Sequence, residues 1–255
     1  YVWIKRILLP NYTYDEFIGK LDFEMEKEFG KDYLCRLGRF ATEYDMQVQF
    51  IVFHDELDWA NDRSELIIVS LSFKEGYYSF SPQKYSLSEF KELIKSHSGG
   101  PVSIGSKGLI YGTSRLECSL SKTDSLYPGD ADLLLLNEDN KAVCILEFKK
   151  HTLSSPISEQ CFTNYYPRPD GRKYKRLALL RDYLASKSNS HILFFVLYYP
   201  TQTYIEQQWK LEVIEGNAFS LRATDSFIFE LPADKSDNEY KKVIEKISQV
   251  IAARS

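Results

Sequence analysis

Two short, unbroken apolar runs in the second half of the chain most constrain what it can fold into. Leu133–Leu136 and Ala142–Leu146 contain no charged or strongly polar side chain. Such runs are typical of strands buried on both faces, because a half-exposed strand alternates apolar and polar residues. Residues 137–141, between the two runs, are polar and rich in turn-forming types. The pattern therefore predicts a β-hairpin.

The turn of this hairpin decides which side chains face one another. If Asp139-Asn140 forms a two-residue turn, Glu138 pairs with Lys141, and Asp132 pairs with Glu147 at the far end. Directly opposed side chains share a face of the sheet, with Cβ atoms about 5 Å apart. This register predicts two neighbouring carboxylates at the open end of the hairpin.

A phenylalanine and a lysine follow Glu147 in the second strand. Alternation places Lys149 on the same side as Glu147 and points Phe148 into the core on the other side. Two adjacent carboxylates are costly to bury unless a cation lies between them. Mg²⁺ binds carboxylate oxygens, and a neighbouring lysine can neutralise a phosphate or help to deprotonate a water. The pattern favours metal-assisted phosphodiester hydrolysis. The alternative interpretation is a solvated hairpin end with a cross-strand salt bridge.

These residues resemble the PD-(D/E)xK nuclease superfamily. The resemblance consists of Asp132 followed by an apolar strand, and of Glu147-Phe148-Lys149 closing the next strand. Within that superfamily, Gly129-Asp130-Ala131-Asp132 is similar to the G-x-x-D motif of RecB-like nucleases, and Arg115–Leu120 resembles the strand that precedes it. The Q-x-x-x-Y motif of the same group is imperfect here, because Tyr165 follows Gln160 one residue late. The resemblance covers roughly residues 108 to 200.

The resemblance implies a restriction-endonuclease-like fold and an enzyme that depends on Mg²⁺ or Mn²⁺. Asp132, Glu147 and the carbonyl of Phe148 would hold the metal ion, and Lys149 would act on water and the scissile phosphate. Gln160 would orient Lys149 or the water. The expected substrate is nucleic acid, with DNA favoured over RNA. The alternative is a nuclease-fold module that binds nucleic acid or a partner protein without cutting it.

The charge of the chain is uneven. Its net charge is −4, and residues 1–98 hold 17 acidic and 12 basic side chains. Residues 147–182, in contrast, hold eight basic and four acidic side chains. Because this basic stretch follows the predicted site, we expect phosphate contacts there, although a solvated helix face is the alternative. The candidate nucleic-acid-binding residues are Lys150, Arg168, Arg172, Lys173, Lys175 and Arg176.

A glycine- and proline-containing break divides the chain into two predicted regions. Ser98-Gly99-Gly100-Pro101 separates residues 1–98, an additional α+β region whose role stays open, from residues 99–255, the nuclease-like core. The predicted fold class is α/β, with a mixed sheet flanked by helices. Predicted strands are residues 1–10, 46–54, 65–73, 109–111, 115–120, 191–199, 209–214 and 227–231, the last two as edge strands. Predicted helices are residues 14–29, 86–97, 157–165, 173–185 and 239–253.

Composition indicates the cellular compartment and the absence of an expected membrane span. Cys35, Cys118, Cys144 and Cys161 lack metal-ligand spacing, which indicates free thiols in a reducing compartment such as the cytoplasm or nucleus. No run of 18 apolar residues occurs, so no membrane span is expected. The chain starts without Met or a signal-like segment, so we expect it to be part of a larger parent protein. Assembly into a homo-oligomer is the other possibility that the sequence leaves open.

Overall fold

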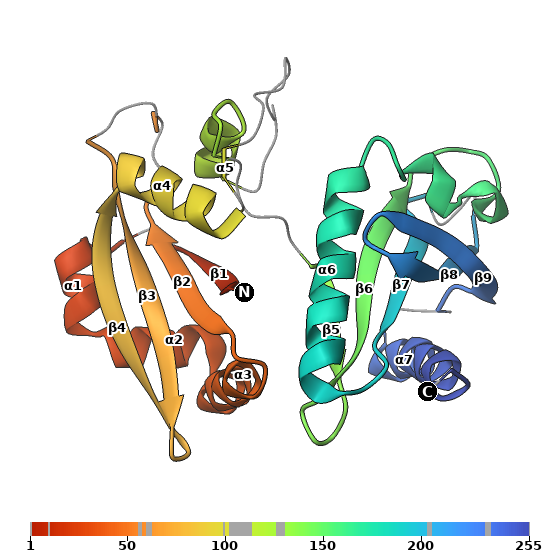
Figure 1. The fold of residues 1–255 in the computed structure, drawn as a ribbon, viewed down its shortest axis with the longest axis horizontal. Helices are drawn as coiled ribbons and strands as arrows, with labels where there is room; N and C mark the ends of the chain where they lie inside the picture. Colours follow the sequence, from red (N-terminus) through yellow and green to blue (C-terminus); the bar gives the residue numbers. More distant parts are fainter. Residues whose placement is uncertain are drawn as a thin grey trace. The chain divides into compact units, whose positions relative to one another are not determined.

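The computed structural model describes residues 2–9, 11–55, 58–59, 63–98, 100–101, 114–125, 131–202, 206–232 and 236–254. The chain forms two compact units, Tyr1–Pro128 and Gly129–Ser255 (Figure 1). The division therefore lies later in the chain than the predicted seam after residue 98. Leu116 and Leu120 explain the difference, because both are buried in the hydrophobic core of the first unit.

The first unit is a four-stranded mixed sheet with helices, as expected for an α+β region. The strand order is β1-β2-β3-β4, with β1 parallel to β2 and the other pairs antiparallel. One face packs against α4 and α5 through a core that includes Ile51, Phe53 and Phe90. On α3, Gly38 allows a close approach to the sheet, since a Cβ there would lie 2.8 Å from that of Phe73. The elements are β1 (Val2–Leu8), α1 (Tyr14–Gly19), α2 (Leu21–Phe29), α3 (Lys31–Glu43), β2 (Gln47–Phe53), β3 (Glu65–Lys74), β4 (Tyr77–Ser86), α4 (Leu87–Ser98) and α5 (Arg115–Leu120).

Two predictions for the first unit need correction. The single helix expected over residues 14–29 is two helices, which meet at Lys20. The strand expected over residues 115–120 is wrong, since Arg115–Leu120 is helix α5. Its N-cap Ser114 accepts a hydrogen bond from the Glu117 N–H, and the buried residues Leu116 and Leu120 have helical i, i+4 spacing. The strand expected at residues 109–111 lies outside the described residues.

The second unit is a five-stranded mixed sheet between helices, which confirms the coarse α/β prediction. The strand order is β5-β6-β7-β8-β9; β6 and β7 are parallel, and the other pairs are antiparallel. Helix α6 connects β6 to β7 as the crossover that a parallel pair requires. The elements are β5 (Leu133–Leu136), β6 (Ala142–His151), α6 (Gly171–Ser188), β7 (Leu193–Pro200), β8 (Gln208–Asn217), β9 (Ser220–Glu230) and α7 (Asp237–Ala252) (Figure 1).

The two helices of the second unit cover opposite faces of the sheet. Ile247 and Val250 of α7 pack into a core that includes Leu146 and Leu197. Glu147, the neighbour of Leu146 in β6, points to the other face, where Lys173 of α6 contacts it. The segment expected as a helix over residues 157–165 forms two 3₁₀ turns, Ile157–Glu159 and Phe162–Asn164. The prediction that β8 is an edge strand is wrong, since β8 lies between β7 and β9.

The hairpin has the predicted register at its open end and a different one near its turn. Leu133 pairs with Leu146, and this register extended by one residue places Asp132 opposite Glu147. A bulge between Leu135 and Leu136 then shifts the pairing. The expected Glu138–Lys141 pair is therefore wrong. Instead, the turn is longer, with the Asn137 N–H donating to the Lys141 carbonyl at 2.9 Å and Asn140 at a φ of 61°. Asparagine tolerates this left-handed conformation.

Burial distinguishes the two strands of this hairpin. Strand β6 is largely buried as predicted, but β5 lies at the edge of the sheet, and Leu133 and Leu136 are exposed. The expectation that Phe148 points into the core is also wrong. Its side chain is 37% exposed, because the strand partner β5 ends before this part of β6.

All four cysteines are free, although of these only Cys144 is fully buried. None of the described helices has the length and apolar character that crossing a membrane requires.

Candidate functional site

The two predicted carboxylates meet at the open end of the hairpin. Asp132 directly precedes β5, and its Oδ2 accepts a hydrogen bond of 2.7 Å from the Phe148 N–H. Glu147, in β6, is only 1% exposed. The main chain of β6 thus fixes Asp132 beside Glu147, as the hairpin register predicted.

A lysine from α6 occupies the position between these carboxylates. The Lys173 Nζ lies 2.8 Å from Oε2 of Glu147 and 3.5 Å from Oδ1 of Asp132. Sequence reasoning predicted a divalent metal ion here, and it assigned Lys173 to phosphate contacts. The structure makes Lys173 a member of the carboxylate cluster, because the first turn of α6 faces the hairpin end.

The second lysine of the cluster is Lys149, held by two carboxylates and two aromatic rings. Its Nζ lies 3.1 Å from Oε1 of Glu147 and 2.6 Å from Oδ2 of Asp170. The same ammonium lies 4.9 Å from the ring centre of Tyr165 and 5.4 Å from that of Tyr174, within cation–π range. The side chain of Lys149 is therefore held from several directions.

Asp170 is a site residue that sequence reasoning missed. It is the N-cap residue of α6 and follows a proline-rich turn, which sequence reasoning treated only as an interruption of a helix. An acidic residue directly before a helix whose first turns are basic was the available signal. Its role becomes visible only when α6 packs against β6.

Burial dominates the electrostatics of Glu147. It raises the pKa of Glu147 to about 7, while Lys173 opposes the increase and the nearby Asp132 adds to it. Each carboxylate oxygen lies beside one lysine ammonium, Oε1 at 3.1 Å from Lys149 and Oε2 at 2.8 Å from Lys173. Glu147 is therefore a buried acid whose charge is only partly compensated, and it has remaining capacity for a cation.

Lys149 is held in its protonated form. Burial lowers its pKa, but the hydrogen bond to Asp170 and the interactions with Glu147 outweigh burial, so the net pKa is raised above the usual value for lysine. In this arrangement the side chain supplies a positive charge and does not accept a proton near neutral pH.

Gln160 acts on Lys149 only indirectly. It lies in the irregular segment between the two 3₁₀ turns, not on a helix as expected. Its Oε1 accepts a hydrogen bond of 3.1 Å from the hydroxyl of Tyr165, whose ring contacts Lys149. The Gln and Tyr of the imperfect motif are thus bonded to each other despite the extra residue between them.

A buried ion pair in β8 anchors this irregular segment. Lys210 and Glu212 are 6% and 4% exposed, and their charged atoms lie 2.8 Å apart. The Lys210 ammonium donates to the carbonyls of Ser158 and Gln160, while Glu212 Oε2 accepts 2.7 Å from the Phe162 N–H. Sequence reasoning missed this pair. Its signal was a lysine and a glutamate alternating with apolar residues in one strand.

The other predicted nucleic-acid contacts do not belong to the cluster. Arg168, Arg172 and Lys175 are exposed, and Lys150 is exposed on the opposite face of the sheet from Lys149. Arg176 is partly buried; its pKa is lowered by burial and by the nearby Arg172. These positions leave the exposed side chains available to a ligand.

The donor atoms of the cluster, carboxylate and carbonyl oxygens, are of the type that a hard divalent ion prefers. Among the described residues, no three His, Cys, Asp or Glu side chains are grouped so that they could hold a metal ion by themselves. A metal here would use the carboxylates of Asp132 and Glu147, the carbonyl of Phe148, and water. This donor set suits Mg²⁺, which retains several waters in protein sites.

Comparison of the chain with protein-family models, with curated proteins and with solved structures found no match. The family resemblance therefore rests on the motif residues alone.

Proposed function

We propose that the protein is a Mg²⁺- or Mn²⁺-dependent nuclease with a restriction-endonuclease-like core in its second unit, and that its substrate is DNA rather than RNA. The observation that carries the proposal is the cluster at the hairpin end, where two carboxylates share one cation and a second lysine is fixed beside them. The succession of an antiparallel hairpin, a crossover helix and a parallel strand agrees with the fold that the resemblance implies.

Asp132, Glu147 and the Phe148 carbonyl would hold the metal ion. Such an ion supplies an activated water and neutralises charge on the phosphate. The fit rests on Glu147, whose two buried oxygens each lie beside a lysine ammonium, so this position already favours a cation. Because the Lys173 ammonium lies between the two carboxylates, metal binding requires Lys173 to give up these contacts. Its charge then becomes available to the nucleic acid.

Lys149 would stabilise negative charge on the scissile phosphate. Since its pKa is raised, it acts as a cation and not as the base that deprotonates water. Asp170 and Tyr165 are positioning residues, because they hold the ammonium of Lys149. Gln160 positions Tyr165 in turn. The arrangement is preorganised for charge that develops in the transition state.

The test is cleavage of linear, circular and single-stranded DNA, and of RNA, with Mg²⁺ or Mn²⁺. Lys149→Ala should lower the cleavage rate about 10²- to 10³-fold, the usual effect of removing one transition-state contact. Glu147→Gln should abolish both cleavage and the rise in melting temperature caused by Mn²⁺, because an amide is a poorer ligand for a hard cation. The control is Lys141→Ala, which changes an exposed lysine at the opposite end of β6.

A module that binds nucleic acid without cutting is the second candidate. It is favoured by one observation: the Lys173 ammonium already lies between the two carboxylates, so a cation occupies this position without a metal ion. Tight binding of DNA by the wild-type protein with no cleavage of any substrate would select this candidate. Equal cleavage by the wild type and Lys149→Ala would place the chemistry elsewhere in the chain.

A further inference from the structure

An aromatic groove lies on the face of the second sheet opposite to the carboxylate cluster. It has a volume of about 830 Å³, within the range of small-ligand sites. Two of its aromatic side chains are accessible from solvent, since Phe148 is 37% and Tyr240 is 48% exposed. The groove is lined by Asp132, Phe148, Lys150, Leu197, Tyr199, Trp209, Leu231, Pro232, Tyr240 and Val243.

The groove is continuous with the candidate site through Asp132. One oxygen of this carboxylate contacts Lys173 in the cluster and the other accepts from the Phe148 N–H, while the same residue lines the groove. The two regions communicate because β5 begins only at Leu133, so its pairing with β6 stops at Leu146. The carboxylate cluster and the groove therefore flank the same stretch of β6, on its two faces.

The lining of the groove suits a flat group that binds by stacking, beside an exposed lysine. Of the described lining residues, eight are aromatic or aliphatic, and the only charged ones are Asp132 and Lys150. Trp209 already donates its indole N–H to the Glu230 carbonyl. Aromatic walls bind nucleobases by stacking with little preference for sequence, and an exposed lysine at the edge suits a phosphate.

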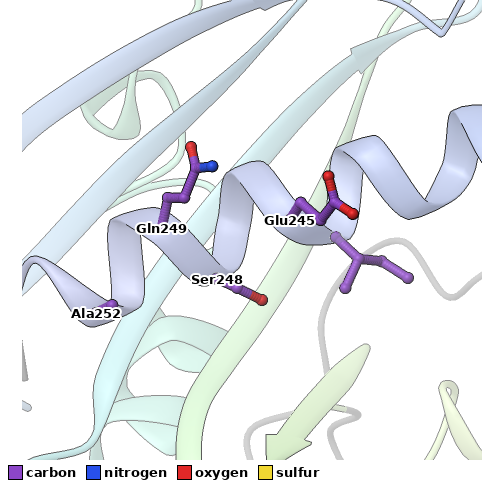
Figure 2. Close-up of a pocket in the computed structure, with 5 residues that line it drawn as sticks. Glu245, Ser248, Gln249 and Ala252 are labelled. Atoms are coloured by element: carbon purple, nitrogen blue, oxygen red, sulfur yellow. The ribbon is translucent and has the colours of Figure 1, made fainter.

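A second hollow in the same unit has a different character. Its described lining residues all belong to α7, and Glu245, Ser248, Gln249 and Ala252 lie along the helix as Figure 2 shows. They include a carboxylate and no basic or aromatic side chain. Among its described lining residues, this hollow therefore lacks an aromatic ring for stacking on a base and a cation for a phosphate. Its residue Ile244 is 61% exposed on the same helix as Tyr240 and provides a control position.

We propose that the groove binds an unpaired nucleobase of the nucleotide next to the phosphate that Lys149 would contact. The proposal rests on the proposed nuclease function and adds a substrate class to it. A base inside the groove cannot remain paired, so the substrate is single-stranded DNA or a single-stranded end or flap. Recognition is by stacking on Phe148 and Tyr240, with Lys150 near the backbone.

The experiment measures binding of a single-stranded oligodeoxynucleotide that contains 2-aminopurine, in EDTA so that no cleavage occurs. The wild type should bind it more tightly than the matching duplex and quench its fluorescence by stacking. Tyr240→Ala and Phe148→Ala should each weaken binding about tenfold, the loss of roughly one stacking contact. Ile244→Ala should bind like the wild type. An abasic oligodeoxyribose phosphate should bind equally to the wild type and Tyr240→Ala.

Equal affinity of Tyr240→Ala and Ile244→Ala for the single strand would overturn the proposal, as would equal affinity of the wild type for single strand and duplex, or no binding at all. These outcomes are separate from those of the cleavage test. Loss of single-strand binding in Tyr240→Ala together with a wild type that cuts nothing would keep the groove and reject the nuclease. Normal cleavage with unaltered binding in Tyr240→Ala would reject only the groove.

Discussion

The two sheets of this protein have similar topology, but different kinds of side chain are buried beside them. Each is mixed, with one parallel pair. Among the described residues, the buried polar side chains of the first unit are serines alone. The second unit instead buries three acidic or basic side chains, Glu147, Lys210 and Glu212, together with His151 and Gln160.

The difference shows that the buried charges of the second unit are not a requirement of this kind of sheet. Burying a charge costs several kcal/mol even when it is paired, and apolar replacements often stabilise a core. The first unit achieves its core with apolar residues such as Ile51, Leu66 and Ile68. We infer that the charges of the second unit are tied to its cluster, since Glu147 belongs to it and Lys210 and Glu212 anchor the segment that reaches Lys149.

Breaking the buried ion pair should have the largest effect on stability. Lys210→Met leaves Glu212 buried without its cation and should destabilise the second unit by about 3–5 kcal/mol. Lys84→Met is the matched control, because Lys84 and Asp15 form a pair of similar length, 2.7 Å, on the surface of the first unit. Its effect should be slight. Hydrogen exchange reads the two units separately. Equal loss of protection in both variants would remove the contrast between the two interiors.

The pH dependence of stability should differ in sign between the units. Glu147 has an ordinary pKa of 4.5 when unfolded and about 7 when folded, so between these values the folded state retains a proton that the unfolded state has lost. Stability of the second unit should therefore fall as pH rises from about 4.5 to 7, by at most about 3 kcal/mol, and Glu147→Gln should lack this contribution. Saturating Mn²⁺ should reduce it, because the metal favours the carboxylate.

Glu26 in the first unit has a pKa shifted in the opposite direction to that of Glu147. Its pKa is lowered, chiefly by the hydrogen bond from the Tyr78 hydroxyl. It therefore contributes stability above its unfolded pKa and loses it as pH falls, and Glu26→Gln should remove that loss. The measurement is hydrogen exchange of β3 and β7 over both pH windows, from well below 4.5, where Glu26 titrates, up to about 7, where Glu147 titrates. Parallel pH profiles for the two strands would contradict the difference in electrostatics.

Exposed charges should have the smallest effects, and these should appear in binding rather than in stability. Arg172→Ala and Lys175→Ala should each reduce the slope of log affinity against log salt for DNA by about 0.7 to 0.9, the loss of one phosphate contact. Lys74→Ala, which removes an exposed lysine from the acidic first unit, should leave the slope unchanged. A change in Lys74→Ala with none in Arg172→Ala or Lys175→Ala would move the binding surface into the first unit.

Much of the fold and half of the cluster were predictable from sequence because they depend on local patterns. The apolar runs predicted β5 and β6, and alternation along β6 correctly placed Glu147 and Lys149 on one face. Helical spacing predicted α7, and a capping box predicted the start of α4, where Glu89 accepts from the Ser86 N–H at 2.7 Å. Where periodicity was short, as in Arg115–Leu120, helix and strand were not distinguishable without the N-cap and the core.

The sequence predicted two adjacent carboxylates, Asp132 and Glu147, and favoured a metal cation between them because the two carboxylates repel each other. It could not determine that Lys173 lies between them, because that depends on how α6 packs against β6. Lys173 is 41 residues from Asp132 in the sequence, so no local pattern connects the two. The same packing brings Asp170 into contact with Lys149. The pairing of β8 with β7 places Lys210 where its ammonium donates to the Gln160 carbonyl. Local propensity determined which segments are strands and helices. Long-range packing alone decided which charges meet, because ion pairing acts through space and has no period along the chain.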